Sequence, residues 1–390
     1  MNARLAGRMD RLTSEGAFDV MARAAALEAA GREIVHLEIG EPQFPTPPHV
    51  VEAAERALRD GYTRYCPPPG LPAFREAAAA FLGRTRGVDA PAARVVAAPG
   101  AKPLIFYVIL ALSGAGDEVV VPDPGFPTYA SVAAFAGATP IPLPLRAAND
   151  FRVDPDELAS LVSDRTRLVV LNSPHNPTGG ALTAADLEAV AEVVAGRDLH
   201  VLSDEVYWSM RYDAGHVSPA ALGSLRDRTI LLDGCSKTFA MTGWRLGFAL
   251  LPPALVEPVT RLLVNSVSCT AAFVQMAGVA ALDGPAEDTA AMRAELRRRR
   301  DLMVGGLRQL PGVACTEPAG AFYAFPDIRG LGASSADVAD RLLEHAGVAC
   351  LPGTAFGVFG EGHLRLSYAA APGAITAALE AMASALPEFS

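Results

Sequence analysis

The chain contains 390 residues, of which 51% are hydrophobic and 19% charged, so it has ample apolar material for a buried core. That length exceeds what one compact core usually holds and predicts one large domain with a smaller one. The formal net charge of -10 argues against nucleic acid or an anionic membrane surface as a partner, because both require a basic face.

Cysteine usage and the lack of long apolar runs indicate the cellular setting. The N-terminus shows no apolar segment of signal-peptide length, and no apolar run approaches the roughly 20 residues of a membrane span. The cysteines form no Cys-x-x-Cys pair, which predicts reduced thiols in a cytoplasmic protein, with neither a disulfide framework nor a metal site. They are Cys66, Cys235, Cys269, Cys315 and Cys350.

The first part of the chain predicts helices joined by extended connections. Apolar residues recur with helical spacing over 17–30, and helices are also expected at 49–59 and 73–82. A short strand is expected at 34–40. The segment 41–48 is rich in proline, so it is neither helix nor central strand.

Between residues 95 and 251, short apolar strands alternate with helices. This alternation predicts an α/β fold with a mostly parallel sheet covered on both faces. Polar residues gather just past the strand ends, where open α/β sheets place their ligands. The expected strands are 95–97, 118–121, 167–171, 199–203 and 229–232, and a helix over 184–194 is capped by Thr183.

The last third has a different pattern and predicts a separate α+β domain. We therefore expect a large domain over 48–284, and a small domain built from 1–47 together with 285–390. Long helices are expected at 253–263, 271–282 and 286–309, short strands at 321–325, 348–351 and 363–368, and further helices at 336–345 and 374–385.

Lys237 stands in a turn of small residues between two apolar runs, with Arg245 eight residues later. A lysine in that setting loses much of its hydration, and desolvation lowers the pKa of an amine. A lysine that forms a Schiff base needs such a lowered pKa. The alternative is an ordinary surface lysine in the loop at a strand end.

Three further groups stand at strand ends. Gly100-Ala101-Lys102 follows a strand and begins a helix, where free backbone N–H groups favour binding of a phosphate. Small residues are also common at strand–helix turns that have no function. The Asn176 amide could reach a ligand beside the sheet, although asparagine also forms turns. Asp204 is expected to be partly buried, so its carboxylate would need a cationic partner such as a protonated pyridine nitrogen. The alternative for Asp204 is helix capping. Tyr207 could donate to a phenolate oxygen.

The order of three motifs carries a resemblance to a known family. Asn-Pro-Thr-Gly at 176–179, Asp-Glu-Val-Tyr at 204–207 and Ser-Lys-Thr-Phe-Ala-Met-Thr-Gly-Trp-Arg-Leu-Gly at 236–247 resemble the class I and II pyridoxal-phosphate-dependent aminotransferases, the aspartate aminotransferase-like group. The similarity covers nearly the whole chain. It includes Ile39–Pro42, Tyr65 with Gly70-Leu71-Pro72, Gly100–Lys102, Gly320–Tyr323 and Leu364–Tyr368.

The resemblance implies a fold-type I enzyme whose cofactor is pyridoxal 5'-phosphate. Lys237 would be the Schiff-base lysine and would carry the proton between the substrate and the cofactor. Asp204 would keep the pyridine nitrogen protonated, which makes the ring an electron sink. Tyr207 and Asn176 would bind the oxygen of the ring hydroxyl.

The resemblance also assigns the remaining contacts. The phosphate would be held by Arg245, Ser236 and the backbone amides of Gly100, Ala101 and Lys102, and Phe126 would stack on the ring. Arg365 would pair bidentately with the α-carboxylate of the substrate, which Gly40 approaches through its backbone. Tyr65 would reach the phosphate of a neighbouring subunit, which implies a homodimer with shared active sites.

Two departures from the family pattern leave substrate choice open. Gly234 stands where many members have a serine that contacts the phosphate, and Phe126 stands where some have tryptophan. The segment 265–270, which resembles the loop that lines the partner's side-chain pocket, contains no arginine. That absence favours an aromatic or aliphatic amino acid over one with a second carboxylate.

We expect an aminotransferase that works by a ping-pong mechanism between an amino acid and a 2-oxo acid. A β- or γ-lyase or related synthase on the same fold is the second interpretation, because sequence does not show which bond to the α-carbon is broken. A ligand-sensing aminotransferase-like module is the third. The acidic charge and the lack of a spare DNA-binding segment disfavour it.

Overall fold

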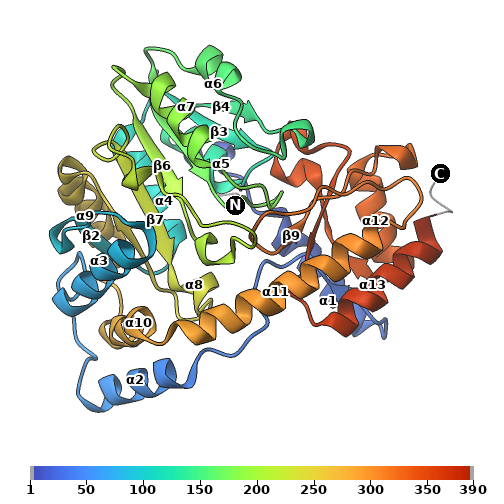
Figure 1. The fold of residues 1–390 in the computed structure, drawn as a ribbon, viewed down its shortest axis with the longest axis horizontal. Helices are drawn as coiled ribbons and strands as arrows, with labels where there is room; N and C mark the ends of the chain where they lie inside the picture. The colour runs from blue at the N-terminus through green and yellow to red at the C-terminus, as the bar shows by residue number, and fades with distance from the viewer. Residues whose placement is uncertain (1–3, 387–390) are drawn as a thin grey trace.

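The computed structural model describes residues 4–386, and its centre is a seven-stranded sheet in the order β2-β8-β7-β6-β5-β3-β4 (Figure 1). All neighbouring strands are parallel except β8, which runs antiparallel to both β2 and β7. The strands are β2 (Val95–Ala98), β3 (Glu118–Asp123), β4 (Thr139–Pro144), β5 (Thr166–Asn172), β6 (His200–Asp204), β7 (Thr229–Gly234) and β8 (Gly247–Leu250).

Helices cover both faces of this sheet, because side chains alternate between the faces along each strand. In β3, Val119 and Val121 join one core with α4, α5 and α9, whereas Val120 joins another with α6 and α7. A third core packs α2, α3 and α10 against the β2 end. The helices are α2 (Pro48–Arg59), α3 (Pro72–Arg86), α4 (Ala101–Leu112), α5 (Thr128–Ala136), α6 (Pro155–Leu161), α7 (Ala184–Val194), α9 (Pro253–Val267) and α10 (Ala272–Asp283).

The C-terminal part forms a second body beside the sheet. The long helix α11 (Ala286–Leu307) runs from α10 across the molecule to α12 (Ser335–Ala346) and α13 (Pro372–Ala385) (Figure 1). Three short strands, β9 (Tyr323–Ala324), β11 (Leu351–Pro352) and β12 (Leu364–Ser367), form an antiparallel sheet in the order β11-β12-β9. These elements and α11 enclose a core of their own.

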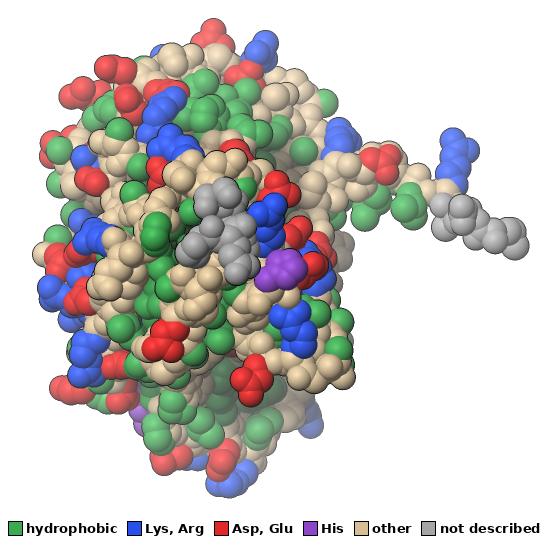
Figure 2. Space-filling view, turned by 90° about the vertical axis from the view of Figure 1, so that its right-hand side faces the viewer, with side chains coloured by type: hydrophobic (Ala, Val, Ile, Leu, Met, Phe, Trp, Pro, Cys, Tyr) green, Lys and Arg blue, Asp and Glu red, His purple; other side chains and the backbone are tan. Residues whose placement is uncertain are grey.

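The N-terminal segment contacts both bodies. Strand β1 (Val35–His36) pairs in parallel with β10 (Val348–Ala349), and the preceding helix α1 (Gly16–Ala29) packs near it. Before α1, the backbone N–H of Thr13 donates to Ser131 in α5 at 2.9 Å. The N-terminal end of the described chain projects from the body as a narrow arm (Figure 2).

The expected elements are present with shifts at their ends, and the strand expected over 348–351 is divided between β10 and β11. Strand β8 and a short helix over 235–238 were not predicted. β4 and α6, between α5 and β5, were not predicted, and the strand expected over 34–40 is only two residues long. Within residues 4–386, no helix combines the length and apolar character needed to cross a lipid bilayer.

Candidate active site

A cavity of about 470 Å³ opens beside the carboxyl ends of β5, β6 and β7. It gathers residues from the large sheet, the N-terminal segment and the C-terminal sheet. Eleven of the residues selected from the sequence line it: Gly40, Ala101, Lys102, Phe126, Asn176, Asp204, Tyr207, Ser236, Lys237, Arg245 and Arg365.

Lys237 lies in α8 (Cys235–Thr238), the short turn that follows β7. Its ammonium donates a hydrogen bond of 2.6 Å to the carbonyl oxygen of Gly40. Burial lowers the pKa of Lys237 to about 8, and the positive charges of Arg365, Arg245 and Lys102 lower it too, against an opposing effect of Glu41. A substantial fraction of this amine is therefore neutral and nucleophilic near physiological pH.

Asp204 is the last residue of β6 and is almost fully buried. Its carboxylate accepts hydrogen bonds from the hydroxyl of Tyr129 at 2.6 Å and from the backbone N–H of Val206 at 3.3 Å. Burial raises its pKa to about 6, against the effect of these two donors, and the nearby charges of Asp233 and Glu205 raise it further. No cationic side chain of residues 4–386 hydrogen-bonds to Asp204. The site thus presents a buried carboxylate that requires a cation from a ligand.

Arg365, in β12, supplies a buried positive charge on the wall of the same cavity. One of its terminal nitrogens donates to the carbonyl oxygen of Glu38, and the other lies 3.3 Å from the side-chain oxygen of Asn176. Its Nε has no partner, and no carboxylate within the described chain forms an ion pair with it. A guanidinium held in this way is suited to bind a carboxylate from a ligand.

Two tyrosines also line the cavity. The hydroxyl groups of Tyr207 and Tyr323 are 2.8 Å apart, and Tyr323 packs its ring 4.5 Å from the guanidinium of Arg365. Gly40 lies directly against Tyr323: a Cβ at this position would overlap the tyrosine hydroxyl. The absence of a side chain at Gly40 therefore lets the N-terminal segment approach the site.

Arg245 lies against the start of α4. The backbone of Gly100 has φ of +98°, and a Cβ there would overlap the guanidinium of Arg245. Arg245 donates to the carbonyl oxygen of Thr242 at 2.9 Å and has no ion pair among the described residues. The free N–H groups of a helix N-terminus beside an unpaired guanidinium are suited to bind an anion.

The remaining predicted residues have distinct positions. Tyr65 is 90% exposed and lies outside the cavity, so in the single chain it does not join the site. Lys102 forms an ion pair with Glu15, and its ammonium lies 5.3 Å from the ring of Phe126. No cluster of residues suited to a metal ion occurs between residues 4 and 386.

Sequence reasoning missed several residues that line the cavity, among them Tyr129, Tyr323 and Glu15. Tyr129 is the hydroxyl donor to Asp204, and its position in α5, one turn after Phe126, was the available signal. Tyr323 belongs to a motif noted in the sequence, but no role was assigned to it. Glu15 precedes α1 and carries no local motif, so only the folded chain places it beside Lys102.

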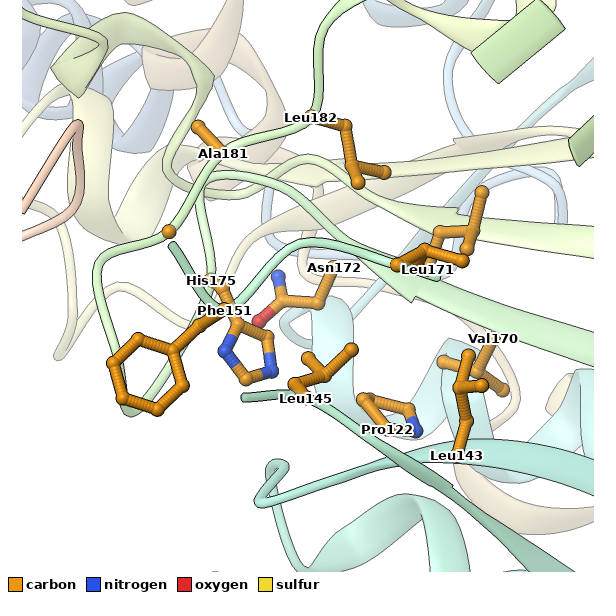
Figure 3. A pocket seen from close by; sticks show the side chains of 12 residues that line it. Pro122, Leu143, Leu145, Phe151, Val170, Leu171, Asn172, His175, Ala181 and Leu182 are labelled. Carbon is orange, nitrogen blue, oxygen red and sulfur yellow. The ribbon is translucent and has the colours of Figure 1, made fainter. Parts of the chain in front are cut away.

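Behind the site a second cavity of only about 10 Å³ is lined mainly by apolar side chains, as Figure 3 shows. This volume is at the lower limit for one water molecule. Asn172, on its wall, donates to the carbonyl oxygen of Asp204 at 3.0 Å and accepts from the backbone N–H of Asn176 at 2.8 Å. The region is therefore packing that holds two site residues in place, and it has no room for a metabolite.

Comparison with known proteins shows the family of the chain. The family model described as aminotransferase class I and II matches residues 32–382. An aspartate aminotransferase of Pyrococcus horikoshii is 39% identical over 371 residues, which are 94% of this chain and 93% of that protein. An arginine–pyruvate transaminase of Pseudomonas aeruginosa is 41% identical over 358 residues, 91% of each protein. The crystal structure of the aspartate aminotransferase from Rhizobium meliloti matches with a TM-score of 0.95 at 34% identity and covers 99% of each chain.

The mostly parallel sheet with flanking helices is that of a fold-type I enzyme. The chain belongs to the class I and II aminotransferases. It is a pyridoxal-phosphate-dependent transaminase that moves an amino group between an amino acid and a 2-oxo acid. The family, fold class and reaction predicted from the sequence are confirmed.

Proposed function

We propose that the cavity around Lys237 holds pyridoxal 5'-phosphate and is the site of transamination. The residues fit this cofactor in two places. The buried carboxylate of Asp204 lacks a cationic partner, which a protonated pyridine nitrogen would provide. The unpaired guanidinium of Arg245, beside the start of α4, suits a phosphate, and Ser236 adds a hydroxyl nearby.

Other residues complete the proposed cofactor site. Phe126 offers an aromatic face to the ring, and Tyr207 and Asn176 are placed to bind the ring oxygen. The amides of Gly100, Ala101 and Lys102 would join Arg245 at the phosphate. Gly234 contributes no hydroxyl, so the phosphate would depend more heavily on Arg245 and Ser236.

Bound in this way, the cofactor would act as an electron sink for charge that develops at the α-carbon of the substrate. Lys237 would hold and move the proton at that carbon, for which its lowered pKa suits it. Arg365 and the backbone of Gly40 would orient the substrate through its α-carboxylate. The walls formed by Tyr207 and Tyr323 would limit access of water.

The observation that carries this assignment is Arg365, a buried guanidinium without a carboxylate partner, on the wall of the same cavity as Lys237. An amino acid and a 2-oxo acid share the α-carboxylate that Arg365 would bind. Arg365→Ala should raise KM for both substrates by about a hundredfold, because a buried charge-assisted pair is lost. The visible absorbance of the bound cofactor should stay unchanged.

A purified sample tests the cofactor assignment directly. The wild-type protein should show a visible absorbance band, and Lys237→Ala should abolish it, whereas Lys102→Ala should retain it. A band that survives Lys237→Ala contradicts the role of Lys237. Mixing the loaded enzyme once with an amino acid should yield the matching 2-oxo acid without free ammonia, and release of ammonia would instead indicate elimination.

We further propose that the preferred substrate is an aromatic or aliphatic amino acid. The ion pair with Glu15 neutralises Lys102 on the cavity wall, so this lysine offers little attraction to a second carboxylate. A panel of amino acids with 2-oxoglutarate or pyruvate as acceptor tests this preference. Reaction with aspartate and glutamate alone would refute it.

We also propose a cytoplasmic homodimer with shared active sites. Leu5, Met9 and Leu12 are exposed before α1, and Tyr65 is 90% exposed, as expected for groups that a second copy covers. The free cysteines support a reducing compartment. Light scattering of the purified protein tests the dimer.

We propose that residues 48–284 form the large domain and that 1–47 join 285–390 in the small domain. The pairing of β1 with β10 supports this division, because it ties the N-terminal segment to the C-terminal part.

A further inference from the structure

A cluster of buried charges lies behind the active site and is not used by the proposed reaction. Arg86, the last residue of α3, has a fully buried side chain that donates to the carboxylate of Asp233. Its Nε lies 3.5 Å from a carboxylate oxygen of Glu205, whose side chain is also fully buried; this is an ion-pair contact without a hydrogen bond. One guanidinium thus joins two carboxylates.

Both carboxylates stand beside residues of the active site. Glu205 follows Asp204 directly at the end of β6. Asp233 lies at the end of β7, where the chain passes through Gly234 into the turn that carries Lys237. Arg86 therefore connects the ends of the two strands that present Asp204 and Lys237 to the cavity.

A third contact comes from the segment that follows Tyr207. The guanidinium carbon of Arg86 lies 3.8 Å from the centre of the Trp208 ring and 5.3 Å from that of Phe81. This cation–π contact fixes the plane of the guanidinium. The planar group donates to Asp233 and keeps its Nε within ion-pair distance of Glu205, a geometry that a lysine cannot reproduce.

The carboxylates are also held from other sides. Glu205 accepts from Ser203 at 2.9 Å and from Ser218 at 2.6 Å, and His216 contacts it at 2.9 Å. Burial alone would raise the pKa of Glu205, but His216 and Arg86 bring it below its ordinary value. Burial raises the pKa of Asp233 to about 6, against the effect of Arg86, so both carboxylates are ionised above that pH.

Such a cluster adds little to the free energy of unfolding. Buried ion pairs are often no more stabilising than apolar residues of the same size, because the charges lose their hydration. What the cluster provides instead is directional geometry. This geometry acts at the ends of β6 and β7, which carry Asp204 and lead to Lys237.

We propose that Arg86 is a positioning residue of the active site, which ties the end of β6 to the end of β7 and so sets Asp204 and Lys237 relative to each other. This inference rests on the proposed function of those two residues. Removal of Arg86 should weaken cofactor binding and slow the reaction. KM for the amino acid should change little, because Arg365 belongs to a different sheet.

Arg86→Ala tests the proposal, with Arg298→Ala as the matched control, since Arg298 is an exposed arginine paired with Glu295. The dissociation constant of the cofactor should rise about tenfold or more in Arg86→Ala, and kcat should fall by a similar factor. Guanidinium ion at non-denaturing concentration should restore both values in Arg86→Ala. It should have no such effect on the wild type or on Arg298→Ala.

Arg86→Lys keeps the charge and covers the case in which Arg86→Ala does not fold. It should retain a melting temperature near that of the wild type but show weaker cofactor binding and lower kcat. If either folded variant keeps cofactor affinity and kcat within twofold of the wild type, Arg86 is only structural and the proposal is overturned. If the wild type itself shows no absorbance band that depends on Lys237, the proposed function fails and this inference falls with it.

Discussion

The ammonium of Lys237 donates a hydrogen bond of 2.6 Å to the carbonyl oxygen of Gly40, a residue that lies 197 positions earlier in the chain. The contact joins the turn after β7 to the N-terminal segment, which pairs through β1 with the C-terminal body. The amine at the centre of the site is thus held by backbone from a distant part of the fold, and its surroundings set its pKa.

The lowered pKa of Lys237 leads to a prediction about loading of the protein with its cofactor. The neutral amine is the reactive form, so the rate at which cofactor-free protein takes up pyridoxal phosphate should rise with pH and level off above about 8. Stopped-flow absorbance across a pH series measures this rate. A midpoint near 10.5, the ordinary lysine value, would contradict the prediction.

Glu41 provides a control for that experiment. Its negative charge raises the pKa of Lys237, in opposition to burial and to the nearby cations. Glu41→Gln should therefore move the midpoint of the pH profile downward. An upward movement would show that another group controls the amine.

Asp204→Asn should reduce kcat by about a hundredfold or more, because the buried negative charge that would pair with the ring nitrogen is lost while the side-chain shape is kept. Tyr129→Phe removes only the hydroxyl that donates to Asp204 at 2.6 Å, so a loss of about tenfold is expected. Steady-state kinetics on both variants checks the order. Equal losses in the two variants would show that the charge itself is unimportant.

Gly40→Ala should lower kcat strongly, because its new Cβ would overlap the hydroxyl of Tyr323 and push it from Tyr207. Adding Tyr323→Phe to Gly40→Ala removes that hydroxyl and should recover part of the lost activity. Tyr323→Phe alone is the control. If the double variant is no better than Gly40→Ala, the steric explanation is wrong.

Arg211 provides a prediction about stability. Its Nε and Nη1 are buried without hydrogen-bond partners, which is costly. Arg211→Met should therefore leave the free energy of unfolding unchanged or raise it by about 1 kcal/mol. Arg299→Met is the control and should lower it by about 3 kcal/mol, because buried Arg299 donates to the carbonyl oxygens of Ala369 and Ala370. Urea unfolding measures both, and a clear loss of stability in Arg211→Met would contradict the first expectation.

The sequence predicted the central fold well where local signals agreed with each other. Thr183 begins α7 with a capping box formed with Asp186, and α7 spans the residues that were expected. Strand β4 was missed because three of its six residues are prolines, which disfavour strands. The structure accommodates them because β4 is the edge of the sheet and pairs only with β3.

For the site, ordered motifs selected Lys237, Asp204 and Arg365, and the cavity brings all three together. The residues that were missed act through long-range contacts. Arg86 and Asp233 are 147 positions apart, and neither stands in a motif that predicts their meeting. Contacts such as that between Arg86 and Asp233 depend on how helices pack against the sheet. The periodicity of apolar residues along the chain does not predict that packing.

The prolines of β4 have one more consequence. On the side that faces β3, the N–H of Thr139 donates to Asp117, just before that strand, at 2.9 Å, and the N–H of Leu145 donates to Asp123 at its end at 2.8 Å. Because backbone direction alternates along a strand, the nitrogens of the intervening even-numbered residues face outward, and these are Pro140, Pro142 and Pro144. The free edge of the sheet therefore offers no N–H donor at these positions to a strand from another molecule. At the opposite edge, Ala97 already donates to Pro69. Donors for an added strand are therefore reduced at both edges of the sheet, which disfavours aggregation by edge-to-edge pairing.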